Sequence, residues 1–399
     1  MIFSDLSLRA VITGVLAAIV GFAGAFAVVV QGLGAVGANA EQTASALMAL
    51  CIGMGVCSIV LSLFYRMPIS IAWSTPGAAM LTTAGVGAAD FNLAVGAFCI
   101  CAVLLTLAGL WKPLTRLIGQ IPTPVASAML AGILFELCLA PVKAVSEYPL
   151  FALPLFLVWL VVGKLNKLLA VPAALIAFFV IIFFFLDISQ GMAELQQQSV
   201  FTKLVWVTPA FSVTAFIGIA IPLFVVTMAS QNIPGIGVLH ANKYTPDSGK
   251  LFTVTGAFSL LTAPFGGHAI NLAAIIAALC ASEEAHSDRS KRYWSAVMAG
   301  VCYLLIAVFV GFVTRLVTLA PPILIQTVAG LALIGTCAGA VVAAFDKPKF
   351  REAAAVTFFI TASGVAFLGI SGAFWGLVAG WMIILWQNVD TECGPDTQA

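Results

Sequence analysis

Charged residues are scarce in this sequence: only 8% of its 399 residues are Asp, Glu, Lys or Arg. Typical soluble domains carry about 25% charged residues, which supply much of their polar surface. With 62% hydrophobic residues and a mean hydropathy of +1.12, the chain has too little polar surface to coat a soluble fold of its size. The composition therefore excludes a soluble globular protein and indicates an all-α chain that crosses a membrane many times.

Net charge is also nearly absent, at +1, so it gives no argument for a nucleic-acid or acidic partner.

An intramembrane enzyme would need a paired acid, a metal cluster or a nucleophile with its base inside the apolar runs. Three histidines and one deep acid do not supply these. Most of the nine cysteines are scattered through apolar runs, where cysteine behaves as a small apolar residue. We therefore expect no enzymatic activity, no cofactor and no metal site.

Long apolar segments dominate what is present. A membrane span needs about 20 residues at 1.5 Å each. The first segment follows "MIFSDLSLRA", which has too little positive charge for a cleavable signal. Two segments, 68–84 and 264–281, are short and interrupted by polar or helix-breaking residues. The fourteen expected segments are 9–33, 43–64, 68–84, 92–111, 122–141, 149–163, 168–186, 210–231, 250–262, 264–281, 293–314, 321–345, 352–369 and 371–388.

The basic residues of the loops support this count. With the N-terminus in the cytoplasm, fourteen of them fall inside and only Lys143, Lys203 and Arg315 fall outside. Cytoplasmic loops carry an excess of Lys and Arg, and a wrong segment count would flip every later loop. We therefore predict a multi-pass protein of a bacterial inner membrane with both termini in the cytoplasm.

The chain contains an internal repeat. "RLIGQIPTPVASAMLAGILFELCLAPV" from Arg116 matches "RLVTLAPPILIQTVAGLALIGTCAGAV" from Arg315, 199 residues later. Gln31 in "FAVVVQGLG" likewise matches Gln231 in "VVTMASQNIPG". Segments 1–7 and 8–14 are therefore two copies, and because seven is odd the copies run through the membrane in opposite directions. Such inverted repeats are typical of secondary transporters.

The two interrupted segments predict where a ligand binds. In "IAWSTPGAAML", Ser74 or Thr75 would cap a helix that has Pro76 in its first turn. In "PFGGHAINLAAI", a new helix would begin near Asn271. The inversion brings both helix N-termini together near the membrane midplane, where their unpaired N–H groups favour an anion.

Neutral polar side chains surround this crossing point, and segments 1, 3, 8 and 10 contain no Asp or Glu. Neutral donors suit a carboxylate, and the aromatic residues beside the breaks would hold an apolar ring. Pro234 and Gly235 are expected to end the eighth helix so that the two repeat-related glutamines lie beside the half-helices. The predicted substrate-binding residues are Gln31, Trp73, Ser74, Thr75, Thr227, Gln231, Asn232, Phe265, Gly266, Gly267, His268 and Asn271.

Structural roles remain open for several of these residues. The glutamines could link neighbouring helices, His268 could bond a backbone carbonyl, and Trp73 could simply pack in the core. Glu136 is the one acid well inside an expected span, so it and His268 are candidates for carrying a proton. By the helical rise Glu136 lies about 20 Å from the start of its helix, which also fits exposure in a wet vestibule.

Several motifs, among them "AWSTPGAAML", "PLFVVTMASQNIPG", "EAHSDRSKRYW" and "ITASGVAFLGISGAFWGL", resemble the BenE family of benzoate:proton symporters over roughly residues 8–388. The resemblance implies the seven-plus-seven fold shared with nucleobase–cation symporters, in which segments 3 and 10 each hold a short strand and a half-helix. It also implies a core domain (1–118 and 209–317) that moves against a gate domain (119–208 and 318–390), with 391–399 as a tail. A homodimer through the gate domain would fit the analogy.

Nucleobase symporters place a glutamate where this chain has Ile270, and another where it has Gln231. The loss of two acids fits an anionic substrate, and it removes the obvious proton carrier. An anion entering a negative interior works against about 2.3 kcal/mol per 100 mV, which one co-transported proton would cancel. We expect proton-coupled import of benzoate or a related aromatic carboxylate. The alternative is an anion exchanger, uniporter or channel, which electrogenicity would distinguish.

Overall fold

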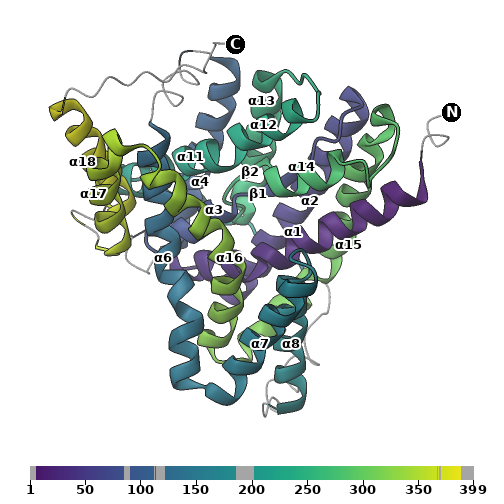
Figure 1. Ribbon diagram of the computed structural model, residues 1–399, viewed down its shortest axis with the longest axis horizontal. Coiled ribbons are helices and arrows are strands. Elements are labelled where there is room, and N and C mark those ends of the chain that lie inside the picture. Colours follow the sequence, from purple (N-terminus) through teal and green to yellow (C-terminus); the bar gives the residue numbers. More distant parts are fainter. Residues whose placement is uncertain are drawn as a thin grey trace.

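The computed structural model describes residues 6–84, 90–111, 113, 122–185, 202–365, 367 and 370–387. Most of these residues are helical (Figure 1). Within the described ranges, seven helices are long and apolar enough to cross a membrane. The prediction of a mainly helical, multi-pass membrane protein is therefore confirmed.

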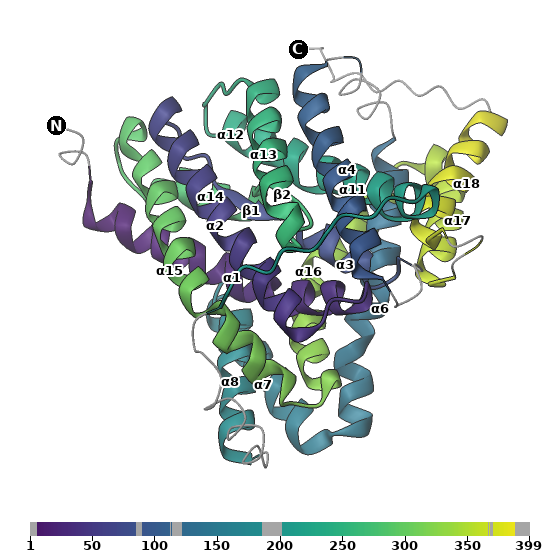
Figure 2. The same ribbon diagram turned by 180° about the vertical axis from the view of Figure 1, so that it is seen from behind.

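In the first half, two long helices precede a short strand and a short helix, and longer helices follow. The elements are α1 (Leu8–Ala35), α2 (Ala40–Tyr65), β1 (Ile71–Trp73), α3 (Thr75–Leu81), α4 (Phe91–Leu110), α6 (Thr123–Glu147), α7 (Pro149–Leu165) and α8 (Ala170–Phe185). Residues 202–212 then cross the back of the molecule as an extended segment (Figure 2). This segment is fixed by backbone hydrogen bonds from Val207 to Pro264 and from Ala210 to Asn92.

The second half repeats this order, with its short strand and short helix again in the third position. The elements are α10 (Val213–Ala215), η2 (Phe216–Ala220), α11 (Ile221–Thr227), η3 (Met228–Asn232), α12 (Ile233–Ala241), α13 (Ser248–Thr262), η4 (Ala263–Phe265), β2 (Ile270–Leu272), α14 (Ala274–Ala281), η5 (Arg289–Lys291), α15 (Tyr293–Thr318), α16 (Pro322–Phe345), η6 (Pro348–Phe350), α17 (Arg351–Ala362) and α18 (Gly372–Trp386).

The helix of the eighth segment does not end where we predicted. Elements α10 to α12 form one continuous helical rod, and α12 continues past Pro234 and Gly235 to Ala241. The prediction was wrong because η3 is π-helical: the N–H of Ile233 bonds to the carbonyl of Met228, five residues earlier. A proline clashes with the carbonyl four residues before it in an α-helix, and the wider π turn relieves that clash.

The two strands join the halves of the chain. Strand β1 pairs antiparallel with β2, with Ile71 opposite Leu272 and Trp73 opposite Ile270, between α3 and α14 (Figure 1). Asn271 therefore lies within β2, and the helix that we expected to begin near it begins at Ala274. Non-helical backbone is tolerated at membrane depth when it is buried and its polar groups are paired, which this ladder achieves.

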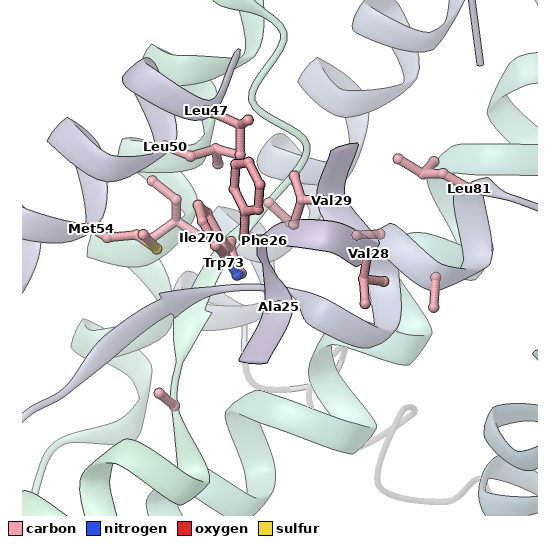
Figure 3. Packing of buried hydrophobic residues seen from close by; sticks show 14 of the residues in the cluster. Ala25, Phe26, Val28, Val29, Leu47, Leu50, Met54, Trp73, Leu81 and Ile270 are labelled. Atoms are coloured by element: carbon pink, nitrogen blue, oxygen red, sulfur yellow. The ribbon is translucent and has the colours of Figure 1, made fainter. Parts of the chain in front are cut away.

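Helix packing surrounds the strands with apolar side chains. Trp73 is 2% exposed and its ring lies 5.6 Å from that of Phe22. Figure 3 shows Trp73 beside Phe26 and Ile270, with Leu50 of α2 close by. Farther out, α2 packs on α15, α4 on α13, and α6 on both α16 and α17. The strands thus sit in a dense core that fixes the start of α3 and of α14.

Candidate functional site

A cavity of about 410 Å³ lies where the short elements of both halves meet longer helices. Its volume falls in the range of about 300–1,000 Å³ that is usual for small-molecule sites. One wall is formed by α1, the end of β1, the start of α3, Ala273 with the start of α14, and the π turn η3. The second wall comes from α16, α8 and the connection before α8. The lining residues are Val20, Gly21, Gly24, Ala25, Ala72, Trp73, Thr75, Pro76, Lys167, Leu168, Val171, Ser230, Gln231, Ala273, Ala274, Ile276, Ala332, Leu333 and Thr336.

Gln231 and Thr75 are among the neutral polar side chains on this lining that are free to bind a ligand. Gln231 projects from the π turn and Thr75 from the first turn of α3. In the described part of the chain, neither side chain has a hydrogen-bond partner. The hydroxyl of the neighbouring Ser230 is already occupied, since it donates to the carbonyl of Val226. The amide of Gln231 and the hydroxyl of Thr75 are therefore available donors, as is the hydroxyl of Thr336 of α16, which likewise has no hydrogen-bond partner among the described residues.

The start of α14 adds backbone donors. Its N-cap residue is Ala273, which has no side chain able to cap the helix, and both Ala273 and Ala274 line the cavity. The first N–H groups of a helix have no partner within the helix, and they carry the positive end of its dipole. This end of the cavity therefore presents positive potential to a bound group.

The start of α3 is different. Of the two predicted caps, Ser74 is the one that caps the helix, because its Oγ accepts the Gly77 N–H at 3.1 Å, and Pro76 lies in the first turn as predicted. Proline has no N–H, so capping leaves the first turn with the N–H of Thr75 as its free donor. The two helix starts are thus unequal, and the attraction for an anion is concentrated at α14.

A buried network behind the cavity holds β1 in place. Thr227 of α11 donates its hydroxyl to the Ser74 Oγ at 2.8 Å, and the His268 Nε2 lies 3.0 Å from the Ser74 carbonyl. All three side chains are fully buried. A carbonyl can only accept, so Nε2 carries the proton and Nδ1 is left as an acceptor. Within the described residues this Nδ1 has no hydrogen-bond partner.

A second network fastens the π turn to β2. The Asn232 Oδ1 accepts the Leu272 N–H at 3.0 Å. The Asn271 Nδ2 donates to the Leu272 carbonyl at 2.6 Å, and both asparagines are fully buried. Neither residue lines the cavity. Their position instead fixes the neighbouring Gln231 relative to the start of α14.

The structure does not bring the Phe265 region to the cavity. The Phe265 ring meets Trp206 edge-on, with centroids 5.7 Å apart, on the extended segment. Gly266 has φ +92°, which only glycine adopts readily, and Gly267 packs on Thr262. These three residues form the turn that leads from η4 into β2, so they shape the site from outside its lining.

Two other predicted residues also lie off the cavity lining. The Nε2 of Gln31 is buried, and the described residues give it no hydrogen-bond partner. Glu136 is exposed on α6. Its carboxylate lies near Gly364, since a Cβ built on that glycine would be 3.8 Å from it. Among the predicted residues, Trp73, Thr75 and Gln231 line the cavity directly.

Sequence reasoning missed several lining residues. Gly21 and Gly24 of α1 lie three residues apart, a spacing that places both on one helix face and offered a usable signal. Thr336 of α16 belongs to the repeated Ala-Gly helix and offered a weaker one. Lys167 was counted only as a basic loop residue, and its contact with the cavity depends on how α7 and α8 pack.

Known proteins resemble this chain along nearly its whole length. Residues 4–385 match the model of a family described as benzoate membrane transport protein. The inner membrane protein YdcO of Escherichia coli (strain K12) is 39% identical over 372 residues, which is 92% of this chain and 93% of that protein. The benzoate membrane transport protein of Acinetobacter baylyi is 31% identical over 376 residues, 94% of each chain.

The fold has a solved counterpart in the transmembrane domain of the cyanobacterium bicarbonate transporter BicA. The TM-score is 0.59 over 95% of this chain and 98% of that one, at 15% sequence identity. This likeness concerns the fold alone, whereas the family match rests on sequence along almost the entire chain. By that match, the protein belongs to the BenE family of benzoate membrane transport proteins.

Proposed function

We propose that this protein carries benzoate, or a closely related aromatic carboxylate, across a bacterial inner membrane. The observation that carries the proposal is the composition of the cavity. Apolar walls face a cluster of donors made by Gln231, Thr75 and the uncapped start of α14. None of the described lining residues is acidic, so none of them repels a carboxylate. An aromatic carboxylate has one apolar and one anionic end, and each has a matching region.

The transport mechanism we propose is movement of the core domain (1–118 and 209–317) against the gate domain (119–208 and 318–390). Fourteen segments arranged as two inverted repeats would build these domains, with both termini in the cytoplasm. The packing of α2 on α15 and of α4 on α13 supports this arrangement, because the inversion exchanges these two contacts. The cavity lies between elements of the two domains, where their relative movement would alternately open it.

Proton coupling would remove the electrical cost of importing an anion. His268 is our first candidate for the proton, since its Nδ1 is buried without a hydrogen-bond partner among the described residues, while its Nε2 lies 3.0 Å from the Ser74 carbonyl. Glu136 is the second candidate, although it lies away from the cavity lining. Without coupling, the same cavity would serve an anion exchanger, uniporter or channel.

Replacing His268 with glutamine tests the coupling. A glutamine can keep the amide donor to the Ser74 carbonyl but cannot take up a proton. In proteoliposomes loaded at neutral pH, we expect wild-type benzoate uptake to follow an imposed proton gradient and His268→Gln uptake to lose that dependence while binding persists. Unchanged gradient dependence would exclude His268 and move the test to Glu136→Gln. Current that follows benzoate without protons would favour the uniporter or channel.

Binding to purified protein tests the proposed substrate. We expect calorimetry to show benzoate binding that Gln231→Ala weakens about 10-fold or more, since a hydrogen bond to a charged group contributes about 1.5–3 kcal/mol. Gln31→Ala is the matched control, because its repeat-related amide is off the cavity lining. Uracil and sulfate serve as competing ligands. Binding of uracil or sulfate without benzoate would overturn the proposed substrate.

A further inference from the structure

One charged side chain lines the cavity in the described structure, and it is a cation. Lys167 lies in the connection 166–169 between α7 and α8, together with Leu168, which also lines the cavity. The side chain of Lys167 is exposed, so it stands where the cavity opens. Within the described chain it has neither an ion pair nor a hydrogen bond. Its charge is therefore available to a ligand.

The backbone holds Lys167 in a tight turn. The Asn166 Oδ1 accepts the Leu168 N–H at 2.9 Å, and the Asn166 carbonyl accepts the Leu169 N–H at 3.1 Å. Such an asparagine turn restricts the backbone conformation of the residue inside it, which here is Lys167. Lys167 is thus presented to the cavity by a defined backbone rather than by a long loop.

Lys167 and the anion-attracting start of α14 line the same cavity from different walls. The α14 start is fixed to β1, because the Ala273 N–H donates to the Ser70 carbonyl at 3.0 Å. Lys167 comes with the α7–α8 pair, which contacts α16. A carboxylate held between a cation on one wall and helix N–H groups on the other is attracted by both.

We propose that Lys167 is a substrate-binding residue, the gate-side cation that pairs with the carboxylate at the mouth of the cavity. This inference rests on the proposed function and adds a specificity determinant for anions to it. In this proposal a bound carboxylate lies between Lys167 and the start of α14, which line the same cavity. Separation of the walls removes one of its two partners, which weakens binding and favours release.

Lys164 provides a matched control for Lys167. It lies three residues earlier at the end of α7, it is also exposed, and it does not line the cavity. Neutralising either lysine changes the net charge of the protein equally. Only loss of the cavity cation should therefore change binding, whereas a general effect of surface charge should appear in both variants.

The test compares benzoate affinity by calorimetry for wild type, Lys167→Gln, Lys167→Arg and Lys164→Gln at low and high salt. We expect Lys167→Gln to bind about 10-fold more weakly and to lose most of the salt dependence of wild-type binding. Lys167→Arg should restore most of the affinity, and Lys164→Gln should match wild type. In uptake assays the KM of Lys167→Gln should rise more than its kcat falls. Thermal unfolding of each variant checks that it is folded.

The possible failures are distinguishable. If wild type binds benzoate, Gln231→Ala weakens it, and Lys167→Gln matches Lys164→Gln, the inference about Lys167 is wrong and the proposed function stands. If Lys167→Arg binds as weakly as Lys167→Gln, the positive charge is not what matters, and the inference is again overturned. If wild type binds no benzoate, the proposed function falls and the inference falls with it.

Discussion

Replacing Gly24 with leucine should abolish benzoate binding while the protein stays folded. Gly24 lines the cavity, and a Cβ added there would meet no atom within 4 Å. The new side chain would therefore extend into the space that we assign to the substrate. Because the cavity is only about 410 Å³, we expect the affinity to fall by about 100-fold or more, equivalent to about 2.7 kcal/mol. Calorimetry on purified protein measures this loss.

Gly34→Leu is the control for this result. Gly34 lies on the same helix, is exposed, and also has no atom within 4 Å of an added Cβ, but it does not line the cavity. It should bind benzoate as wild type does. Equal affinity of Gly24→Leu and wild type would show that the substrate binds elsewhere, and comparable melting temperatures would show that both variants fold.

Replacing Gly32 with alanine should clearly destabilise the protein. An added Cβ at Gly32 would lie 2.2 Å from the backbone oxygen of Ala78 in α3, and a backbone atom cannot rotate away. The two helices would have to separate, and overpacking of this kind costs about 1–3 kcal/mol or more. We expect a clearly lower melting temperature in detergent, together with weaker benzoate binding because α3 carries Thr75.

The opposite effect on stability is expected at Gly34, two residues away. In Gly34→Ala, nothing crowds the new methyl group, and alanine is favoured over glycine in a helix by about 1 kcal/mol. Its melting temperature should equal or exceed that of wild type. If Gly32→Ala were as stable as Gly34→Ala, the close approach of α1 and α3 would not exist in solution.

Local chemistry explains which parts of the fold could be predicted from sequence. Apolar runs located the long helices: the expected ranges 9–33 and 321–345 correspond to α1 (Leu8–Ala35) and α16 (Pro322–Phe345). The cap at Ser74 was predictable because a serine before a proline-containing first turn needs no tertiary partner. The π turn η3 was not predicted, because Pro234 was read as the end of the helix, and the contact that holds Asn232, from the Leu272 N–H to its Oδ1, is made with a distant part of the chain.

The site likewise combines features that local sequence predicts with features that depend on tertiary packing. The repeat pointed to Gln231, which lines the cavity, but also to Gln31, which does not, since the two halves are equivalent in sequence and not in packing. Trp73 lines the cavity and is also buried in the core, so the two roles that we held open are compatible. The contact of Lys167 with the cavity arises from the packing of α7 and α8 against other helices, which no local pattern encodes.

The pairing of β1 with β2 also sets a condition on biosynthesis. Ala72 pairs with Asn271, so β1 leaves the ribosome 199 residues before its partner strand. At about 5–20 residues per second, translation takes about 10–40 s to supply that partner. During this interval the polar backbone of β1 cannot be left in lipid, where each unpaired group costs several kcal/mol. The insertion machinery must therefore shelter the first half of the protein until the second half arrives.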